Sequence, residues 1–161
     1  MICEGAVMKN IKLTVLCYIQ RKDEYLMLFR NKKNDDENKG KWIGVGGKLE
    51  KGESPAQCML REVREETGLK ITEYAFRGVI TFISDIYDDE YMFLYEGLSF
   101  EGDLSGDCNE GELKWIPKDR ILSLPMWEGD RYFLEPMLNG EKEISLRLEY
   151  KGEQLIGAAR E

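Results

Sequence analysis

The sequence predicts one α/β domain built around a mixed β-sheet. Short segments rich in β-branched and aromatic residues recur along the chain, and one strongly capped helix interrupts them. The length of 161 residues suits a single domain with its own core, and no repeat or linker divides it. We therefore expect one domain over residues 11–161, preceded by a disordered tail over residues 1–10. Translation could begin at Met1 or at Met8.

The first part of the domain is predicted to consist of strands. Ile11–Ile19 is rich in β-branched and aromatic residues, and Tyr25–Arg30 follows the turn-like stretch QRKDE, which indicates a hairpin. The next stretch, NKKNDDENKGK, is a polar loop without a packing signal. KWIGVGG then reads as a short strand that contains glycines.

A helix is predicted over Pro55–Thr67. Ser54 is a strong N-cap residue, and Pro55 stands at the first helical position, where its missing N–H costs nothing. Gln57, three residues after Ser54, completes a capping box. Gly68 is a typical helix stop.

The remaining elements are predicted to complete the sheet and add a second helix. Glu73–Ser84 and Glu90–Phe100 read as a long antiparallel pair, and LKWI as a brief strand that Pro117 ends. A helix is expected around PMWEGDRYFLEPML, where Pro136 must shorten or bend it. EISLRLEY and EQLIGA indicate a final hairpin.

Composition excludes several classes of function. The chain has no histidine, which excludes Ser-His-Asp and Cys-His catalysis in their usual forms and histidine metal sites. The four widely spaced cysteines suggest reduced thiols and a cytoplasmic protein. A net charge of −8 without a basic stripe argues against a nucleic-acid polymer as partner, and no apolar run could span a membrane. Carboxylates, Lys, Tyr, Cys or an oxygen-bound metal remain as sources of chemistry, and oxygen ligands favour Mg²⁺, Mn²⁺ or Ca²⁺.

The predicted helix carries a crowded acidic face. Glu62, Glu65 and Glu66 lie within an arc of about 100°, beside the apolar stripe. These carboxylates repel one another and lie near the negative end of the helix dipole, so a cation is expected among them. The alternative is an ordinary solvated face, partly neutralised by Arg61 and Arg64.

A glycine-rich loop precedes this helix and allows close approach of the backbone to a ligand. Loop and helix together match the pattern G-x5-E-x7-R-E-U-x-E-E-x-G-U, with U aliphatic. The matching residues are Gly47, Glu53, Arg61, Glu62, Val63, Glu65, Glu66, Gly68 and Leu69. This pattern resembles that of the Nudix hydrolase family. The resemblance implies an α/β/α sandwich in which the motif forms a loop-helix-loop.

The resemblance also implies Mg²⁺-dependent hydrolysis of a nucleoside diphosphate linked to another group, with Mn²⁺ as a substitute. It implies that Glu62, Glu65, Glu66 and the Gly46 carbonyl are metal ligands. Glu53 and Arg61 would hold the loop against the helix. In NEGELKW, Glu110 matches a loop acid that completes the metal site or acts as base, and the alternative is a solvated loop acid. The identity of the general base among Glu65, Glu66 and Glu110 stays open.

Segments outside this motif resemble the 8-oxo-dGTP diphosphatase, or MutT-like, branch of the family. They are GKWIGVGGKLEKGE, NEGELKWIP and PMWEGDRYF. In the last, Trp127 matches a base-stacking residue and Asp130 an acid that bonds the purine edge. Trp127 could instead be a core aromatic residue. Two positions depart from the best-known animal enzymes: Gly129 replaces one of two tandem acids, and Ile43 replaces an asparagine.

The expected ligand is a small-molecule nucleotide. Gly46, Gly47 and Lys48 are candidate substrate-binding residues, and Arg30 is either a phosphate contact or a surface arginine. The first hypothesis is hydrolysis of 8-oxo-dGTP or a related oxidised purine nucleotide to the monophosphate and pyrophosphate. The alternatives are a pyrophosphatase for ADP-ribose, a sugar nucleotide or a dinucleotide, and a nucleotide-sensing module without activity. A monomer or a homodimer is expected.

Overall fold

The computed structural model describes residues 10–106 and 108–161; the predicted tail falls almost wholly on residues 1–9, which lie outside the described part. Within that part, nine strands form the sheet. They are β1 (Ile11–Arg21), β2 (Glu24–Arg30), β3 (Trp42–Ile43), β4 (Val45–Lys48), β5 (Lys70–Ser84), β6 (Asp89–Glu101), β7 (Gly111–Pro117), β8 (Leu146–Lys151) and β9 (Gln154–Arg160). The strand order is β3-β2-β1-β6-β5-β8-β9, with β4 against β1 and β7 against β2.

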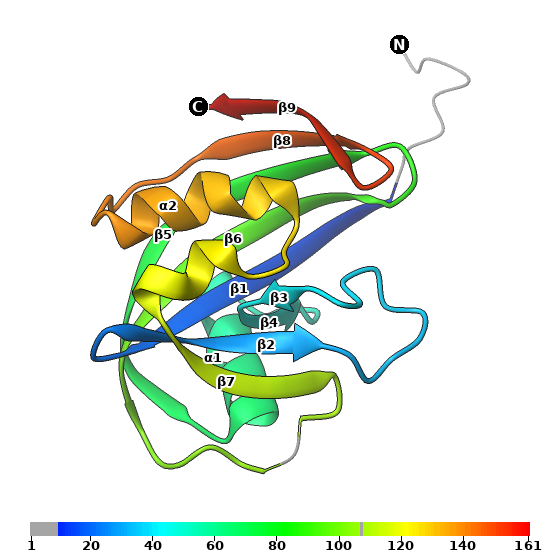
Figure 1. The fold of residues 1–161 in the computed structure, drawn as a ribbon. Helices are drawn as coiled ribbons and strands as arrows, with labels where there is room; N and C mark the ends of the chain where they lie inside the picture. Colours follow the sequence, from blue (N-terminus) through cyan, green and yellow to red (C-terminus); the bar gives the residue numbers. More distant parts are fainter. Residues whose placement is uncertain (1–9, 107) are drawn as a thin grey trace.

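The sheet is mixed, as predicted. Strand β1 runs parallel to β6, β5 and β6 form the long antiparallel pair, and β8 lies parallel to β5. The predicted first hairpin is short, because only Gln20 and Arg21 of β1 pair with β2. The rest of β1 pairs with β6 and β4, while β2 pairs with β3 and β7. Beyond this short hairpin the two strands therefore diverge (Figure 1).

Helix α1 spans Pro55–Thr67, as predicted. The Ser54 hydroxyl accepts a hydrogen bond from the Gln57 N–H, and the Gln57 side chain accepts one from the Ser54 N–H, which completes the capping box. Gly68 ends the helix in the left-handed conformation, with φ of +80°, where glycine has no steric penalty. These local bonds fix where the acidic face begins and ends.

Helix α2 spans Arg131–Leu138 and follows two short 3-10 segments, η1 (Lys118–Ser123) and η2 (Glu128–Asp130). Pro136 lies inside this helix of eight residues. The expectation of a helix around residues 125–138 was wrong for the first part. Trp127 has extended backbone dihedrals, φ −60° and ψ 137°, so its side chain is not placed by a helical face.

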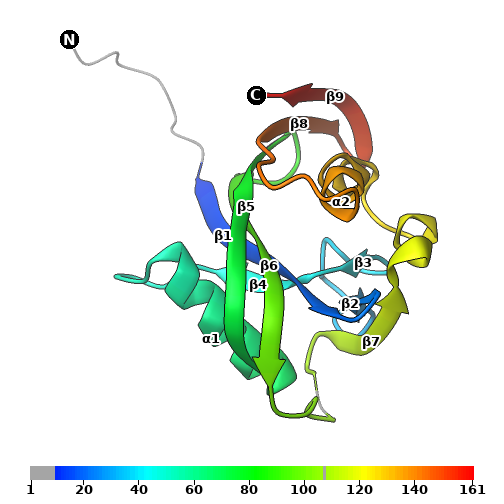
Figure 2. The ribbon, with the colours of Figure 1, turned by 90° about the vertical axis from the view of Figure 1, so that its left-hand side faces the viewer.

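The sheet is covered on both faces, which gives the predicted α/β/α sandwich (Figure 2). Alternating residues of β1 show this directly. Cys17 and Ile19 join the cluster that includes Met59 of α1, whereas Leu16 and Tyr18 join the cluster that includes Phe133 of α2. Each large apolar side chain buried in this way stabilises the fold by roughly 1.5–3 kcal/mol.

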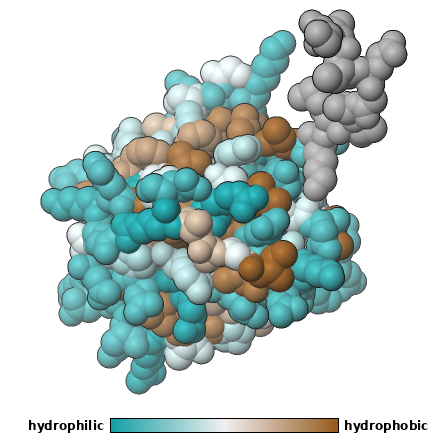
Figure 3. Space-filling view, turned by 90° about the horizontal axis from the view of Figure 1, so that it is seen from above, coloured by the Kyte–Doolittle hydropathy of each residue, from teal (hydrophilic) through white to brown (hydrophobic). Residues whose placement is uncertain are grey.

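The face seen from above is mostly hydrophilic, with separate apolar patches (Figure 3). This agrees with the net charge of −8. Among the described residues, neither α-helix has the length and apolar character needed to cross a membrane.

Candidate active site

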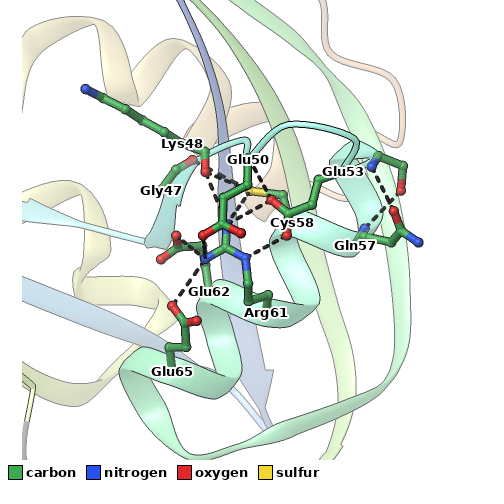
Figure 4. A network of polar contacts seen from close by, with 10 residues as sticks. Gly47, Lys48, Glu50, Glu53, Gln57, Cys58, Arg61, Glu62 and Glu65 are labelled. Atoms are coloured by element: carbon green, nitrogen blue, oxygen red, sulfur yellow. Dashed lines mark hydrogen bonds and ion pairs between the residues drawn. The ribbon is translucent and has the colours of Figure 1, made fainter.

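Arg61 organises the acidic end of the site (Figure 4). Its guanidinium makes two hydrogen bonds to Glu53, of 2.6 and 2.9 Å, and one of 2.8 Å to Glu62. It also contacts Glu65 at 3.2 Å and the backbone carbonyl of Lys48 at 3.2 Å. The Arg61 side chain thereby connects the loop that carries Glu53, helix α1 and strand β4.

Glu53 is held firmly in its ionised form. The hydrogen bonds from Arg61, followed by the N–H of Glu50 at 2.8 Å, lower the pKa of Glu53 to about 2. The same bonds raise the pKa of Arg61 above its ordinary value. The loop from Glu50 to Glu53 is therefore fastened to α1 by a charge-assisted, two-pronged contact.

Two consecutive glycines of β4 meet different neighbours. A Cβ atom on Gly46 would lie 1.9 Å from the backbone oxygen of Val15 in β1, so strand packing alone requires a glycine there. A Cβ atom on Gly47 would lie 2.4 Å from the carboxyl carbon of Glu62. Because Gly47 has no side chain, the Glu62 carboxylate can occupy this space.

Glu66 faces two other acids inside the protein. Burial, then the charges of Glu110 and Glu62, raise its pKa to about 9. Its Oε2 atom is buried and has no hydrogen-bond partner. Arg30 holds Glu110 at 2.9 Å, and Lys33 lies 3.7 Å from the same carboxylate. Glu62 also has a raised pKa, mainly because of burial.

The donor chemistry of this cluster fits a hard divalent cation. In the part of the chain that the structure describes, no three acidic side chains come close enough together to hold a metal ion. Arg61 holds Glu62 and Glu65, and Arg30 holds Glu110. However, the unpartnered buried oxygen of Glu66 and the mutual repulsion of the acids are what a bound cation would relieve. All the candidate ligands are oxygens, as Mg²⁺ and Mn²⁺ prefer.

One cavity of about 540 Å³ connects this cluster to the aromatic end of the site. Its size is within the range of small-molecule pockets. Eight of the residues predicted for the site line it: Arg30, Gly46, Gly47, Lys48, Glu62, Glu110, Trp127 and Asp130. The cavity does not touch Glu53, Arg61, Glu65 or Glu66 directly, and Glu65 is more than half exposed. Ile43, at the position of the asparagine in the animal enzymes, also lines it.

Trp127 is fixed at the aromatic end by several contacts. Its indole N–H donates a hydrogen bond of 2.9 Å to Asn38, and the ammonium of Lys41 lies 4.3 Å from its ring centroid. Tyr150 packs edge-on against it at 5.3 Å, and Tyr87 does so at 6.4 Å. Trp127 is partly buried: it packs against the core cluster that includes Tyr150, and it also lines the cavity.

Asp130 is a buried acid at the same end. Its exposed fraction is 5%, and burial, then the charge of Glu90, raises its pKa to about 8. Its carboxyl makes no hydrogen bond to any other residue in the described ranges. Because the cavity reaches it, this polar group is free for a ligand.

Sequence reasoning missed three residues of this end: Asn38, Lys41 and Tyr150. Asn38 and Lys41 belong to or border a polar loop that carries no apolar period, so no pattern distinguishes them from solvated residues. Tyr150 stands in a predicted strand of the final hairpin, where no pattern distinguishes it from other strand residues. Only the folded chain brings all three to Trp127.

A family model described as NUDIX domain matches residues 10–137. The uncharacterized Nudix hydrolase YvcI of Bacillus subtilis is 35% identical over 129 residues, covering 78% of each chain. The oxidized purine nucleoside triphosphate hydrolase of Danio rerio is 29% identical over 119 residues, covering 73% of this chain and 74% of that one. The crystal structure of a MutT protein from Bacillus halodurans superposes with a TM-score of 0.84 at 26% identity, covering 93% and 97%.

Proposed function

This chain belongs to the Nudix family of hydrolases, and we propose that it hydrolyses 8-oxo-dGTP or a related oxidised purine nucleoside triphosphate. The products would be the nucleoside monophosphate and pyrophosphate. The proposal rests on one continuous cavity. Acidic residues lie at one of its ends, and the buried carboxyl of Asp130 lies near the Trp127 indole at the other. The similarity to the oxidized purine nucleoside triphosphate hydrolase of Danio rerio supports the same substrate class.

At the acidic end, we assign the Gly46 carbonyl, Glu62, Glu65, Glu66 and Glu110 to a site for Mg²⁺, for which Mn²⁺ would substitute. When bound, the cation neutralises charge on the phosphoryl oxygens and acidifies water. Without a cation Glu66 holds its proton at neutral pH, because burial and the charges of Glu110 and Glu62 raise its pKa to about 9. A bound cation would favour the ionised carboxylate, which would then be a candidate base for the proton of the attacking water, alongside Glu110 and Glu65.

Arg61 and Glu53 are positioning residues in this proposal. They do not touch the cavity; Arg61 holds the loop from Glu50 to Glu53 through Glu53 and the end of β4 through the Lys48 carbonyl. Lys48 lines the cavity and brings positive charge to the phosphate end, while Arg30 lines it as the ion-pair partner of Asp36 and Glu110. Water attacks one phosphorus atom, the bridging P–O bond breaks, and the pyrophosphate oxygen carries away the electron pair.

At the other end, the purine would stack on Trp127. Stacking of a base on an aromatic ring contributes roughly 1–3 kcal/mol in nucleic-acid sites. The contacts to Asn38 and Lys41 hold the ring in place before the base arrives. With a pKa of about 8, the carboxyl of Asp130 is protonated at neutral pH, so it can both donate and accept a hydrogen bond at the base edge.

The test is a product assay with 8-oxo-dGTP, dGTP, ATP and ADP-ribose, each with excess Mg²⁺. The proposal predicts fastest release of pyrophosphate from 8-oxo-dGTP and none of this activity in Glu62→Gln. Glu73→Gln, an exposed acid of β5, is the matched control that should retain full activity. Preferred cleavage of ADP-ribose would refute the substrate class, and no turnover of any compound would favour a sensing module.

A further inference from the structure

Tyr150 lies in the wall of the cavity although it is distant from the family motif in sequence. It belongs to β8, beyond residues 10–137 that match the family model. Its ring packs edge-on against Trp127, at 5.3 Å and 80°, and stacks on Phe82 at 6.5 Å and 25°. With an exposed fraction of 6%, it is almost buried, but the cavity reaches it.

The Tyr150 hydroxyl occupies the space next to Gly129. The backbone N–H of Gly129 donates a hydrogen bond of 2.7 Å to that oxygen. A Cβ atom at position 129 would lie 2.4 Å from it, closer than atoms can approach. The Tyr150 phenol therefore occupies the space that a side chain at position 129 would need, so a tyrosine at 150 requires a glycine at 129.

This bond determines how the hydroxyl can act. Because the oxygen already accepts from Gly129, the one hydrogen of the hydroxyl remains to be donated. Within the ranges 10–106 and 108–161, the hydroxyl donates no hydrogen bond, and its one bond is the one that it accepts. A buried donor without a partner costs free energy, and the cavity is the side from which an acceptor can come.

We propose that Tyr150 is a specificity-determining residue whose hydroxyl donates a hydrogen bond to an acceptor on the edge of the base, beside Asp130. This inference rests on the proposed function, since it concerns the base of the same nucleotide. The ligand class it selects is a 6-oxo purine, whose carbonyl accepts. A 6-amino group can only donate, so at the same position it cannot accept from the Tyr150 hydroxyl.

The test compares dITP with dATP, which present a carbonyl and an amino group at the same position. Wild-type enzyme should prefer dITP. Tyr150→Phe should reduce the ratio of kcat/KM for dITP to kcat/KM for dATP by about tenfold, chiefly by raising KM for dITP. The phenylalanine keeps the ring contacts with Trp127 and Phe82. It also leaves the N–H of Gly129 unpaired, which lowers stability but affects both nucleotides equally.

Tyr25→Phe is the control for that loss of stability. It removes another buried hydroxyl, bonded to Glu96 and remote from the cavity, so it should lower Tm without changing the dITP to dATP ratio. The inference is overturned if Tyr150→Phe leaves the ratio unchanged or slows both nucleotides by the same factor.

Binding without hydrolysis separates this inference from the proposed activity. Titration of dIMP and dAMP in EDTA, followed by tryptophan fluorescence, reports base recognition alone. Tighter binding of dIMP that Tyr150→Phe abolishes supports the inference even if no triphosphate is cleaved. Equal binding of the two monophosphates by wild type and variant overturns it, even if oxidised nucleotides are hydrolysed rapidly.

Discussion

Gly46 and Gly47 should respond differently to the same substitution. In Gly46→Ala, the new methyl group would lie 1.9 Å from the backbone oxygen of Val15 and 2.8 Å from its carbonyl carbon. In Gly47→Ala, it would lie 2.4 Å from the carboxyl carbon of Glu62, at the far end of a flexible side chain. The first clash is with a paired strand, and the second is with a group that can rotate away.

The distances give the expected magnitudes. A normal contact of about 3.4 Å requires β1 and β4 to separate by more than 1 Å in Gly46→Ala, which breaks ladder bonds and should cost about 3 kcal/mol or more. Gly47→Ala should cost less than about 1.5 kcal/mol, because only the Glu62 carboxylate moves. That movement displaces a proposed metal ligand by about 1 Å, which is expected to lower kcat/KM about 10²-fold.

Thermal unfolding and hydrolysis of 8-oxo-dGTP, measured on both variants, check this. Gly46→Ala should have a greatly reduced Tm, while Gly47→Ala should have a Tm near that of wild type and little activity. Raised Mg²⁺ should restore part of the activity of Gly47→Ala, because the ligand is displaced and not removed. A stable, fully active Gly47→Ala protein would refute the position assigned to Glu62, and a stable Gly46→Ala protein would refute the packing of β4 on β1.

Three further predictions concern the two ends of the cavity. Asp130 has a folded pKa of about 8 against an ordinary value of 3.8, so its stabilising contribution is complete below pH 4 and is lost as pH rises to 8. The free energy of unfolding of Asp130→Asn should therefore rise relative to that of wild type between pH 5 and 8, by up to about 1.4 kcal/mol per pH unit. Denaturant titrations in which this difference stays constant across that pH range would contradict the prediction. Glu53→Gln should raise several-fold the Mg²⁺ concentration needed for half-maximal rate, because Arg61 then pairs more strongly with Glu62 and Glu65; an unchanged metal titration would be the contrary result. Asn38→Ala should raise KM for all purine nucleotides alike by about threefold to tenfold with little change in kcat, since it frees the Trp127 indole; steady-state kinetics that show a base-dependent effect would assign Asn38 to base reading instead.

The extent of α1 could be predicted because its signals are local. Ser54, Gln57 and Gly68 act within one or two turns of the backbone, so their effects are encoded by neighbours in the chain. The long β5–β6 pair and the final hairpin have the same local origin in adjacent strands and turns. The stretch before α2 could not be predicted in this way. Trp127 is held by Asn38 and Tyr150, which lie 89 and 23 positions away, and those contacts override any helical tendency.

The sequence by itself determined the family motif, the acidic face of the helix and the exclusion of histidine chemistry, because residue identity and short spacing are enough for each. Only the tertiary structure decided which acids meet. Glu110 reaches Glu66 because β7 pairs with β2, and Tyr150 meets Gly129 because β8 pairs with β5. Burial then set the protonation of Asp130, since desolvation depends on the whole surrounding fold and not on neighbours in the chain.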